Sequence, residues 1–300
     1  MAHGPKKWTE ATIERMRLEG RGQGEGKSYK PWIEVLEVSS KGRSRRVPGI
    51  KTGRDHQLLS DVEWKLFLLL EWARNVVDIR EQYPLDRELT LEIASMLRIR
   101  HPVYPGTKVP VVMTVDFPTT EERDGRRSLA AYNAKTTLEA ENVRSMEKLE
   151  IQRYYFQGMG IPHHLVFSSE IPAQTVGNLE RIRGGAVKQG ELEPYPNFFT
   201  ENAQRMVADL ARRKPNETLA QYCVAFDRRF GLSAGTGMRV ALILMLDRIL
   251  LVDLESPDLP NAPLASFPLA QNAGHIKRVG AGGWPRAQAL QVAGVRHCPP

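Results

Sequence analysis

Long hydrophobic runs and cysteines are what this sequence lacks most clearly. Its longest apolar stretch, residues 240–254, is interrupted by Asp247 and two further charged residues, so it does not supply the roughly 18 uncharged residues that span a bilayer. The N-terminal residues are charged, unlike an apolar secretion signal. Cys223 and Cys298 form neither a short metal-binding spacing nor a disulfide framework. These absences predict a soluble, cytoplasmic, nucleoid-associated protein with reduced thiols and no membrane partner.

Acidic residues are missing from one stretch near the N-terminus. Residues 41–54 contain no aspartate or glutamate, and residues 1–60 carry 13 lysines and arginines against 7 acids, which accounts for most of the net charge of +7. Such a segment can neutralise DNA phosphates and make binding salt-sensitive. A solvated basic loop fits the same composition. The candidate phosphate contacts are Gln23, Lys27, Arg43, Arg45 and Arg46.

Three hundred residues are long for one domain, and the residue pattern changes near residue 171. Before this point we expect a mixed α/β domain, residues 1–170. Its apolar spacing predicts helices at 60–74 and 142–157 and strands at 32–38, 76–80, 109–117, 128–135 and 164–167. Asp124-Gly125 predicts a hairpin turn between two of these strands.

The pattern after residue 171 is mostly helical. Periodic segments lie at 200–213, 218–230 and 234–246, and a short strand is expected at 248–252. A winged-helix-like domain over residues 171–255 fits this pattern, and a helical bundle fits nearly as well. Residues 256–300 are rich in proline and glycine with little periodicity, so we expect them to form a flexible tail.

Polar side chains follow two adjacent strands of the predicted sheet. Asp116 lies at the end of the first strand, and Asn133-Ala134-Lys135 ends the second. Residues two apart in a strand share a face, and carboxylates that hold a divalent cation, together with a lysine, suit phosphodiester hydrolysis. Glu63, in the first turn of the helix at 60–74, is placed to complete such a site. Ser60-x-x-Glu63 also has the form of a helix capping box, so its spacing alone leaves both roles open.

Six short blocks occur in one order over roughly residues 13–170. They are Gly20-Arg-Gly-Gln-Gly, Tyr29-Lys-Pro-Trp, His56-Gln-Leu-Leu-Ser-Asp-Val-Glu, Val77-Asp-Ile-Arg-Glu-Gln-Tyr-Pro, Thr114-Val-Asp-Phe and Glu147-Lys-Leu-Glu. Together they resemble the TnsA endonuclease subunit of heteromeric cut-and-paste transposases. The resemblance implies an α/β fold of the restriction-endonuclease-like type, with a mixed sheet flanked by helices, followed by a mostly helical, winged-helix-like domain.

The resemblance also implies a reaction and its partners. The family cuts the 5′ ends, on the non-transferred strand, of a mobile element in double-stranded DNA. It works with an RNase H-like transposase subunit (TnsB-type) and an AAA+ ATPase regulator (TnsC-type). Carried over by motif, the catalytic residues are Glu63, Asp116 and Lys135. One or two Mg²⁺ ions, with Mn²⁺ as a substitute, would be held by Glu63, Asp116, Asn133 and the Ala134 carbonyl.

Two positions depart from the family pattern. Asn133 is a neutral amide where many related nucleases have a carboxylate, so it offers only a carbonyl oxygen to a metal. Gln152 stands where some relatives have a glutamate. The amide at Asn133 keeps open the alternative of a non-catalytic DNA-bridging scaffold between transposase and ATPase. A stand-alone restriction or repair nuclease of the same fold is a further alternative. Joint metal binding by His163 and His164 is not expected, because adjacent strand residues point to opposite faces.

Overall fold

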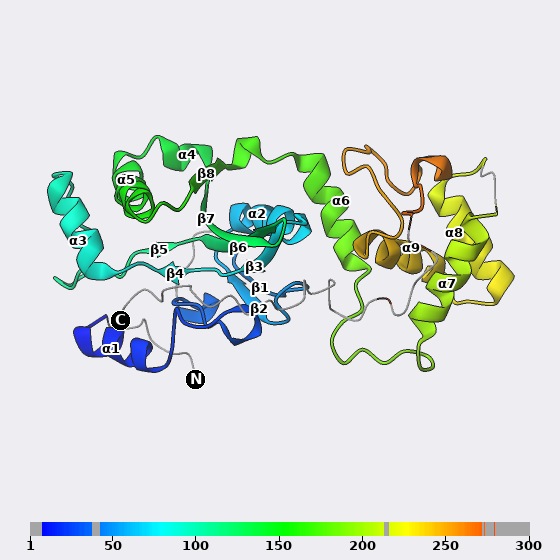
Figure 1. Cartoon of the computed structure of the whole chain (residues 1–300), viewed down its shortest axis with the longest axis horizontal. Coiled ribbons are helices and arrows are strands. Elements are labelled where there is room, and N and C mark those ends of the chain that lie inside the picture. Colours follow the sequence, from blue (N-terminus) through cyan, green and yellow to red (C-terminus); the bar gives the residue numbers. More distant parts are fainter. Residues whose placement is uncertain (1–7, 38–42, 213–215, 272, 274–278, 280–300) are drawn as a thin grey trace.

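The computed structural model describes residues 8–37, 43–212, 216–271, 273 and 279. An α/β part and a helical part lie side by side, with helix α6 (Ala173–Gly184) between them (Figure 1). This arrangement confirms the expected α/β class with a helical C-terminal region. None of the described helices combines the length and the hydropathy that a membrane crossing requires.

The central sheet is mixed. Within the described residues its strand order is β3 (Val76–Ile79), β6 (Phe117–Arg123), β7 (Arg126–Lys135) and β8 (His163–Phe167). The first three strands are antiparallel, and β8 runs parallel to β7. At the predicted hairpin turn, Asp124-Gly125, both residues have positive φ angles, 51° and 74°, as a two-residue hairpin turn of type I′ requires.

Helix α2 (Asp61–Trp72) covers one face of this sheet (Figure 1). It begins after Ser60, whose hydroxyl accepts the backbone N–H of Glu63 at 3.1 Å and so satisfies a free donor of the first turn. Phe67 is fully buried in the same core as Phe117 of β6. Burial of such a side chain contributes roughly 1.5–3 kcal/mol, so α2 and the sheet hold each other in place.

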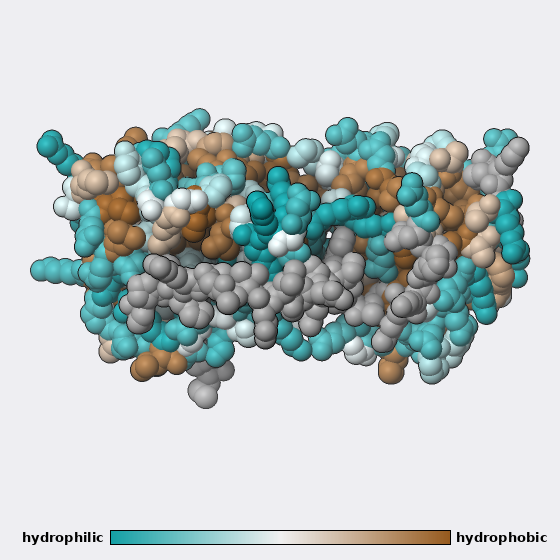
Figure 2. Space-filling model, in the orientation of Figure 1, coloured by the Kyte–Doolittle hydropathy of each residue, from teal (hydrophilic) through white to brown (hydrophobic). Residues whose placement is uncertain are grey.

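Helix α5 (Val143–Gly158) connects β7 to β8, which makes their parallel pairing possible. Its Ile151 is fully buried in one core with Ala131 of β7. Helix α3 (Arg87–Met96), which the sequence did not predict, packs beside α5. Figure 2 shows hydrophobic side chains at this end of the molecule, and four apolar residues line a shallow depression there: Leu89, Ile93, Met96 and Met159.

The predicted strand at 32–38 is wrong. Trp32 is buried in a small core with Ile13 and Met16 of α1 (Glu10–Leu18), and a short 3₁₀ turn follows at Val35–Glu37. Trp32 and Ile33 therefore anchor this segment to α1 instead of pairing in a sheet. Their residue types were typical of a strand, but their side chains pack in this small core.

The predicted strand at 109–117 is present only in part. Strand β5 (Thr114–Val115) pairs with β4 (Tyr83–Pro84) in a separate small sheet. Pro110 lacks the N–H that a ladder needs, and it takes part only in an isolated bridge. Asp116 consequently lies between β5 and β6 rather than at the end of one long strand.

The helical part is built around α9 (Thr236–Leu246). This helix is buried along most of its length and packs against α6, α7 (Phe198–Leu210) and α8 (Leu219–Phe230), as expected for a helix that is apolar all round. The predicted strand at 248–252 is reduced to one bridge between Leu250 and Leu269. The winged-helix assignment stays a prediction.

The segment after residue 255 is packed as far as the structure describes it continuously, to residue 271. Leu259, Leu264 and Phe267 are buried in the same core as α9. These residues therefore do not belong to the flexible tail that we expected from residue 256 onward, because apolar side chains spaced among the prolines bury against the helices. Residues 280–300 of that predicted tail lie outside the described residues.

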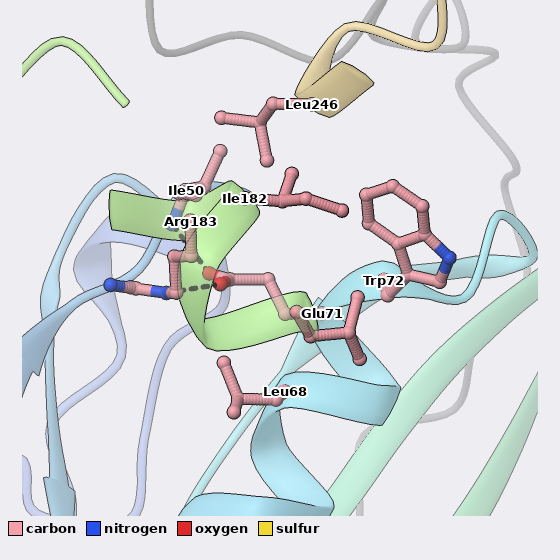
Figure 3. Close-up of a pocket in the computed structure, with 8 residues that line it drawn as sticks. Ile50, Leu68, Glu71, Trp72, Ile182, Arg183 and Leu246 are labelled. Atoms are coloured by element: carbon pink, nitrogen blue, oxygen red, sulfur yellow. Dashed lines mark hydrogen bonds and ion pairs between the residues drawn. The ribbon is translucent and has the colours of Figure 1, made fainter. Parts of the chain in front are cut away.

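A buried ion pair joins the two parts of the chain. Glu71 of α2 accepts the backbone N–H of Ile50 at 2.6 Å and the Arg183 Nε–H of α6 at 2.8 Å. Figure 3 shows these groups among Leu68, Trp72, Ile182 and Leu246, which line the pocket around them. The helical part is thus fixed directly to the helix that carries Glu63 in its first turn.

A second buried network ties strand β2 (Asp55–Leu58) to the residues after β3. The Glu81 carboxylate accepts two hydrogen bonds from Arg54, at 2.8 and 2.6 Å, and one from the backbone N–H of Gln57 at 3.0 Å. His56 Nδ1 lies 2.7 Å from the same carboxylate. Burial raises the pKa of Glu81, but His56 and Arg54 outweigh it and lower this pKa to about 2. Glu81 therefore holds Arg54, His56 and Gln57 against the residues that follow β3.

We expect Glu81→Gln to lower the free energy of unfolding by about 3–5 kcal/mol, because Arg54 would keep a buried charge without its partner. The contribution of the carboxylate is present above its ordinary pKa of 4.5 and is lost as the pH falls toward 2. Urea unfolding at neutral pH measures the effect. Glu150→Gln is the control, since Glu150 pairs with Arg153 on the surface and should contribute under ~1 kcal/mol. Equal losses in both variants would contradict the prediction.

Candidate active site

Asp116 is held by the strands on both sides of it. Its backbone N–H donates to Asn133 Oδ1 at 3.1 Å, and its carbonyl accepts the N–H of Gln82 at 3.1 Å. Its carboxylate oxygen Oδ2 accepts the Ala134 N–H at 2.8 Å and a hydrogen bond from Lys135 Nζ at 3.0 Å. The structure therefore brings the predicted aspartate and lysine into a direct ion pair at the end of β7.

Glu63 reaches the same place from the first turn of α2. Its Oε2 accepts the Leu59 N–H at 2.8 Å, and its Oε1 accepts the Ser60 hydroxyl at 3.1 Å. Burial and then the negative charge of Asp116 raise the pKa of Glu63 to about 8. The helix-capping role is thus present, and the same carboxylate also lies close enough to Asp116 to be repelled by it.

Lys135 is a cation that pairs with Asp116 and also acts electrostatically on Glu63. Loss of surrounding water lowers the pKa of Lys135, but Asp116 and then Glu63 outweigh that effect and raise it. The ammonium therefore stays charged at neutral pH. One lysine does not remove the repulsion between the two carboxylates, since Asp116 still raises the pKa of Glu63. The two acids and the lysine therefore act strongly on one another at this end of β7.

Asn133 is almost fully buried and is used in a hydrogen-bond network. Its Oδ1 accepts the Asp116 N–H, while its Nδ2 donates to Gln152 Oε1 of α5 and lies 2.9 Å from His163 Nε2. Gln152 in turn donates to the Thr114 carbonyl at 3.1 Å. Gln152, which stands where some relatives have a glutamate, therefore fixes the orientation of the Asn133 amide.

The two adjacent histidines lie apart, as expected. Burial and then His164 lower the pKa of His163 to about 4, so its ring is neutral near pH 7 and accepts from Asn133. His164 instead stacks on Tyr132, with ring centroids 4.9 Å apart. Because Tyr132 belongs to the α2-facing core and Asn133 contacts α5, the two rings serve opposite faces of the sheet.

Gln82 is a site residue whose role the sequence analysis missed. Its side chain donates to Glu63 Oε2 at 3.3 Å, and its backbone N–H donates to the Asp116 carbonyl. It therefore links both acids. Its φ of 48° is unusual for a residue other than glycine. The available signal was its place in the block from Val77 to Pro84, next to the predicted site.

The predicted DNA contacts lie on the surface of the N-terminal segment. Gln23, Lys27 and Arg43 are exposed. Arg45 is paired with Asp61 at 2.5 Å, and Arg46 is paired with an aspartate of β2 at 3.0 Å. A phosphate would compete with these partners, so the DNA-binding role of all five residues stays a prediction.

The residues present are compatible with Mg²⁺. Nowhere in the described part of the chain do three His, Cys, Asp or Glu side chains form a metal-binding group. Mg²⁺ needs only one or two carboxylates, with other oxygen ligands and water. Glu63, Asp116 and the Ala134 carbonyl meet that need, and a divalent cation would neutralise the two acids. The chemistry of this donor set, two carboxylates and a carbonyl oxygen beside one lysine, is the observation that supports this fit.

The residue before β6 and the end of β7 thus place an aspartate and a lysine together, beside the helix that carries Glu63, in a mixed α/β domain. A family model described as the TnsA-like endonuclease N terminal matches residues 73–168, from the end of α2 through β8. The chain is also 37% identical over 235 residues to the transposon Tn7 transposition protein TnsA of Escherichia coli. The aligned residues make up 78% of this chain and 83% of that protein. The chain belongs to the TnsA-like endonuclease family.

The comparisons confirm the resemblance found in the sequence. The matched segment contains Asp116, Asn133 and Lys135, while Glu63 lies before it. In the structure, Glu63 is linked to Asp116 through Gln82, which bonds to both residues. Glu63 also interacts electrostatically with Asp116 and Lys135.

Proposed function

We propose that this protein is a Mg²⁺-dependent DNA endonuclease subunit of a transposase. It cuts the 5′ end, on the non-transferred strand, at each end of a mobile element. The observation that carries the proposal is the meeting of Glu63, Asp116 and Lys135, with Lys135 Nζ 3.0 Å from Asp116 Oδ2, in a chain of the TnsA-like family. The name of the Escherichia coli relative connects this activity to transposition.

Glu63, Asp116 and the Ala134 carbonyl would hold one or two Mg²⁺ ions, with Mn²⁺ as a substitute. When bound, the cation supplies charge that polarises the phosphate to be cut. Asn133 was predicted as a further ligand, but its Oδ1 already accepts the Asp116 N–H. The role of Asn133 is therefore mainly to hold Asp116 in position.

Lys135 would act as a charged hydrogen-bond donor. Its ammonium is half-buried beside Asp116 and stays protonated, so it is suited to orient the attacking water and to balance charge on the phosphate. Gln82 keeps the two acids in place through its bonds to Glu63 and Asp116. Hydrolysis would leave a 5′-phosphate and a 3′-hydroxyl.

The proposed partners are an RNase H-like transposase subunit that acts on the 3′ ends and an AAA+ ATPase that regulates both. The test uses the full chain with these two subunits and a double-stranded transposon end labelled on either strand. We expect nicks on the 5′ strand with Mg²⁺ or Mn²⁺ and none in a chelator, since two adjacent acids repel the phosphate without a cation.

Extension of the nicked strand by a polymerase would verify the 3′-hydroxyl. Cuts in the presence of chelator would refute the metal requirement, and cuts on the other strand would refute the strand assignment. A complete lack of cutting by the wild-type complex, together with metal binding that does not depend on Asp116, would favour the non-catalytic scaffold.

A further inference from the structure

One side of helix α5 leads from the active site toward the surface. Gln152 is anchored to the site through Asn133 and Thr114. Residues four apart on a helix lie on the same face, separated by about 6 Å along its axis. Lys148 and Arg144 therefore follow Gln152 in one row. Since α5 connects the parallel strands β7 and β8, it runs back along β7, and the row passes the end of β7 where Lys135 lies.

Lys148 is a cation in this row with positive neighbours. It is exposed, although Leu149 and Gln152 beside it on the helix are buried. Loss of surrounding water lowers the pKa of the Lys148 ammonium, and repulsion from Arg144 and then Lys135 lowers it further. No carboxylate is among the described groups that shift it. The helical row that starts at Gln152 and this repulsion together place Lys148 near Lys135.

Arg144 is the outer member of the row. It pairs with Glu147 one turn along the helix, at 2.7 Å, and its charge also acts on His101. Because the exposed pair with Glu147 is worth only about 0–1 kcal/mol, a phosphate can replace Glu147 at little cost. Lys135, Lys148 and Arg144 together present three cations that lead outward from Asp116.

We propose that Lys148, with Arg144 beyond it, binds backbone phosphates of the DNA strand on one side of the phosphate that is cut. This proposal rests on the function proposed above, because it takes the DNA to lie against Asp116 and Lys135. Lys148 acts in binding and places the strand, whereas Lys135 acts at the reacting phosphate. A backbone phosphate is the matching ligand, since it is an anion that recurs along the strand.

The test is the salt dependence of DNA binding by the full chain. Fluorescence anisotropy with a labelled duplex in chelator, over about 0.05–0.3 M KCl, gives the slope of log K against log salt. We expect Lys148→Ala to make this slope shallower by about 0.9 and to weaken binding about eightfold at 0.1 M salt, because one phosphate contact is lost. Lys148→Arg should keep the wild-type slope.

Arg153→Ala is the matched control. It removes one positive charge from the same helix, but Arg153 is paired with Glu150 on another side of α5, so its slope should equal that of the wild type. A Lys148→Ala slope equal to the wild-type slope overturns the proposal, and so does a wild-type chain that does not bind duplex DNA.

The two proposals fail separately. In the presence of the partner subunits and Mg²⁺, Lys148→Ala should raise KM for the transposon end and leave kcat within about twofold, since it removes binding that is equal in ground and transition states. An Asp116 variant that still cuts DNA would refute the proposed nuclease without changing the binding slopes. Unchanged slopes with an inactive Asp116 variant would refute only the role of Lys148.

Discussion

Replacing Asp116 with asparagine should lower the rate of nicking about a thousandfold or more. The asparagine carbonyl still accepts the Ala134 N–H that Oδ2 accepts now, so the local backbone keeps its contact. The substitution removes the negative charge that pairs with Lys135 at 3.0 Å and one of the two carboxylates available to a cation. Loss of an interaction made at the reacting phosphate lowers kcat itself.

Single-turnover nicking with the partner subunits present measures this effect. Asp124→Asn is the matched control, because it makes the same chemical change in the turn between β6 and β7. Asp124 has a φ of 51°, a conformation that asparagine adopts readily. The control should keep wild-type activity. An Asp116→Asn rate within tenfold of the wild type would remove Asp116 from the catalytic residues.

Glu63→Gln should abolish nicking and at the same time stabilise the metal-free protein. The pKa of Glu63 is raised from 4.5 to about 8 by burial and by Asp116. Folding therefore requires proton uptake at any pH between these two values, and wild-type stability falls as the pH rises from 4.5 through 8. Glutamine does not titrate, so the variant takes up no proton at this position on folding. We expect the Glu63→Gln protein to be more stable than the wild type by roughly 2–4 kcal/mol at pH 8 and by little at pH 4.5.

Urea unfolding in chelator at several pH values measures this difference. The control is Glu88→Gln, which alters a glutamate in the first turn of α3 whose side chain is 72% exposed. Removing a negative charge there should destabilise the helix by about 0.3–1 kcal/mol. If Glu63 served only as a helix cap, Glu63→Gln would lower the free energy of unfolding, as the control substitution does. A loss of stability at pH 8 would therefore favour the capping role alone.

Local signals in the sequence predicted much of the fold around the site. Helix α2 has its capping serine and its apolar spacing, and the β6–β7 hairpin has Asp124-Gly125 at its turn. Both are as predicted. Residue types gave wrong predictions for two strands, at 32–38 and in part of 109–117. Trp32 fills a core with α1 instead of pairing in a strand, and Pro110 limits the strand expected at 109–117.

The sequence by itself determined the type and spacing of the site residues. Asp116, the Asn133–Lys135 segment and Glu63 were identified from strand periodicity and from blocks that resemble one family. Period two places residues 133 and 135 on one face whatever surrounds the strand. The apolar spacing of residues 60–74 likewise predicted the helix α2 itself.

Only the tertiary structure decided how these residues act on one another. Three features depend on contacts between residues far apart in the chain. They are the raised pKa of Glu63, the hydrogen bonds of Gln82 to both acids, and the hydrogen bond between Asn133 and Gln152. The same holds for Lys148, whose ammonium is repelled by Lys135 because α5 runs back along β7. Charges interact according to their separation and burial in space, and neither quantity is set by the residues beside them in the sequence.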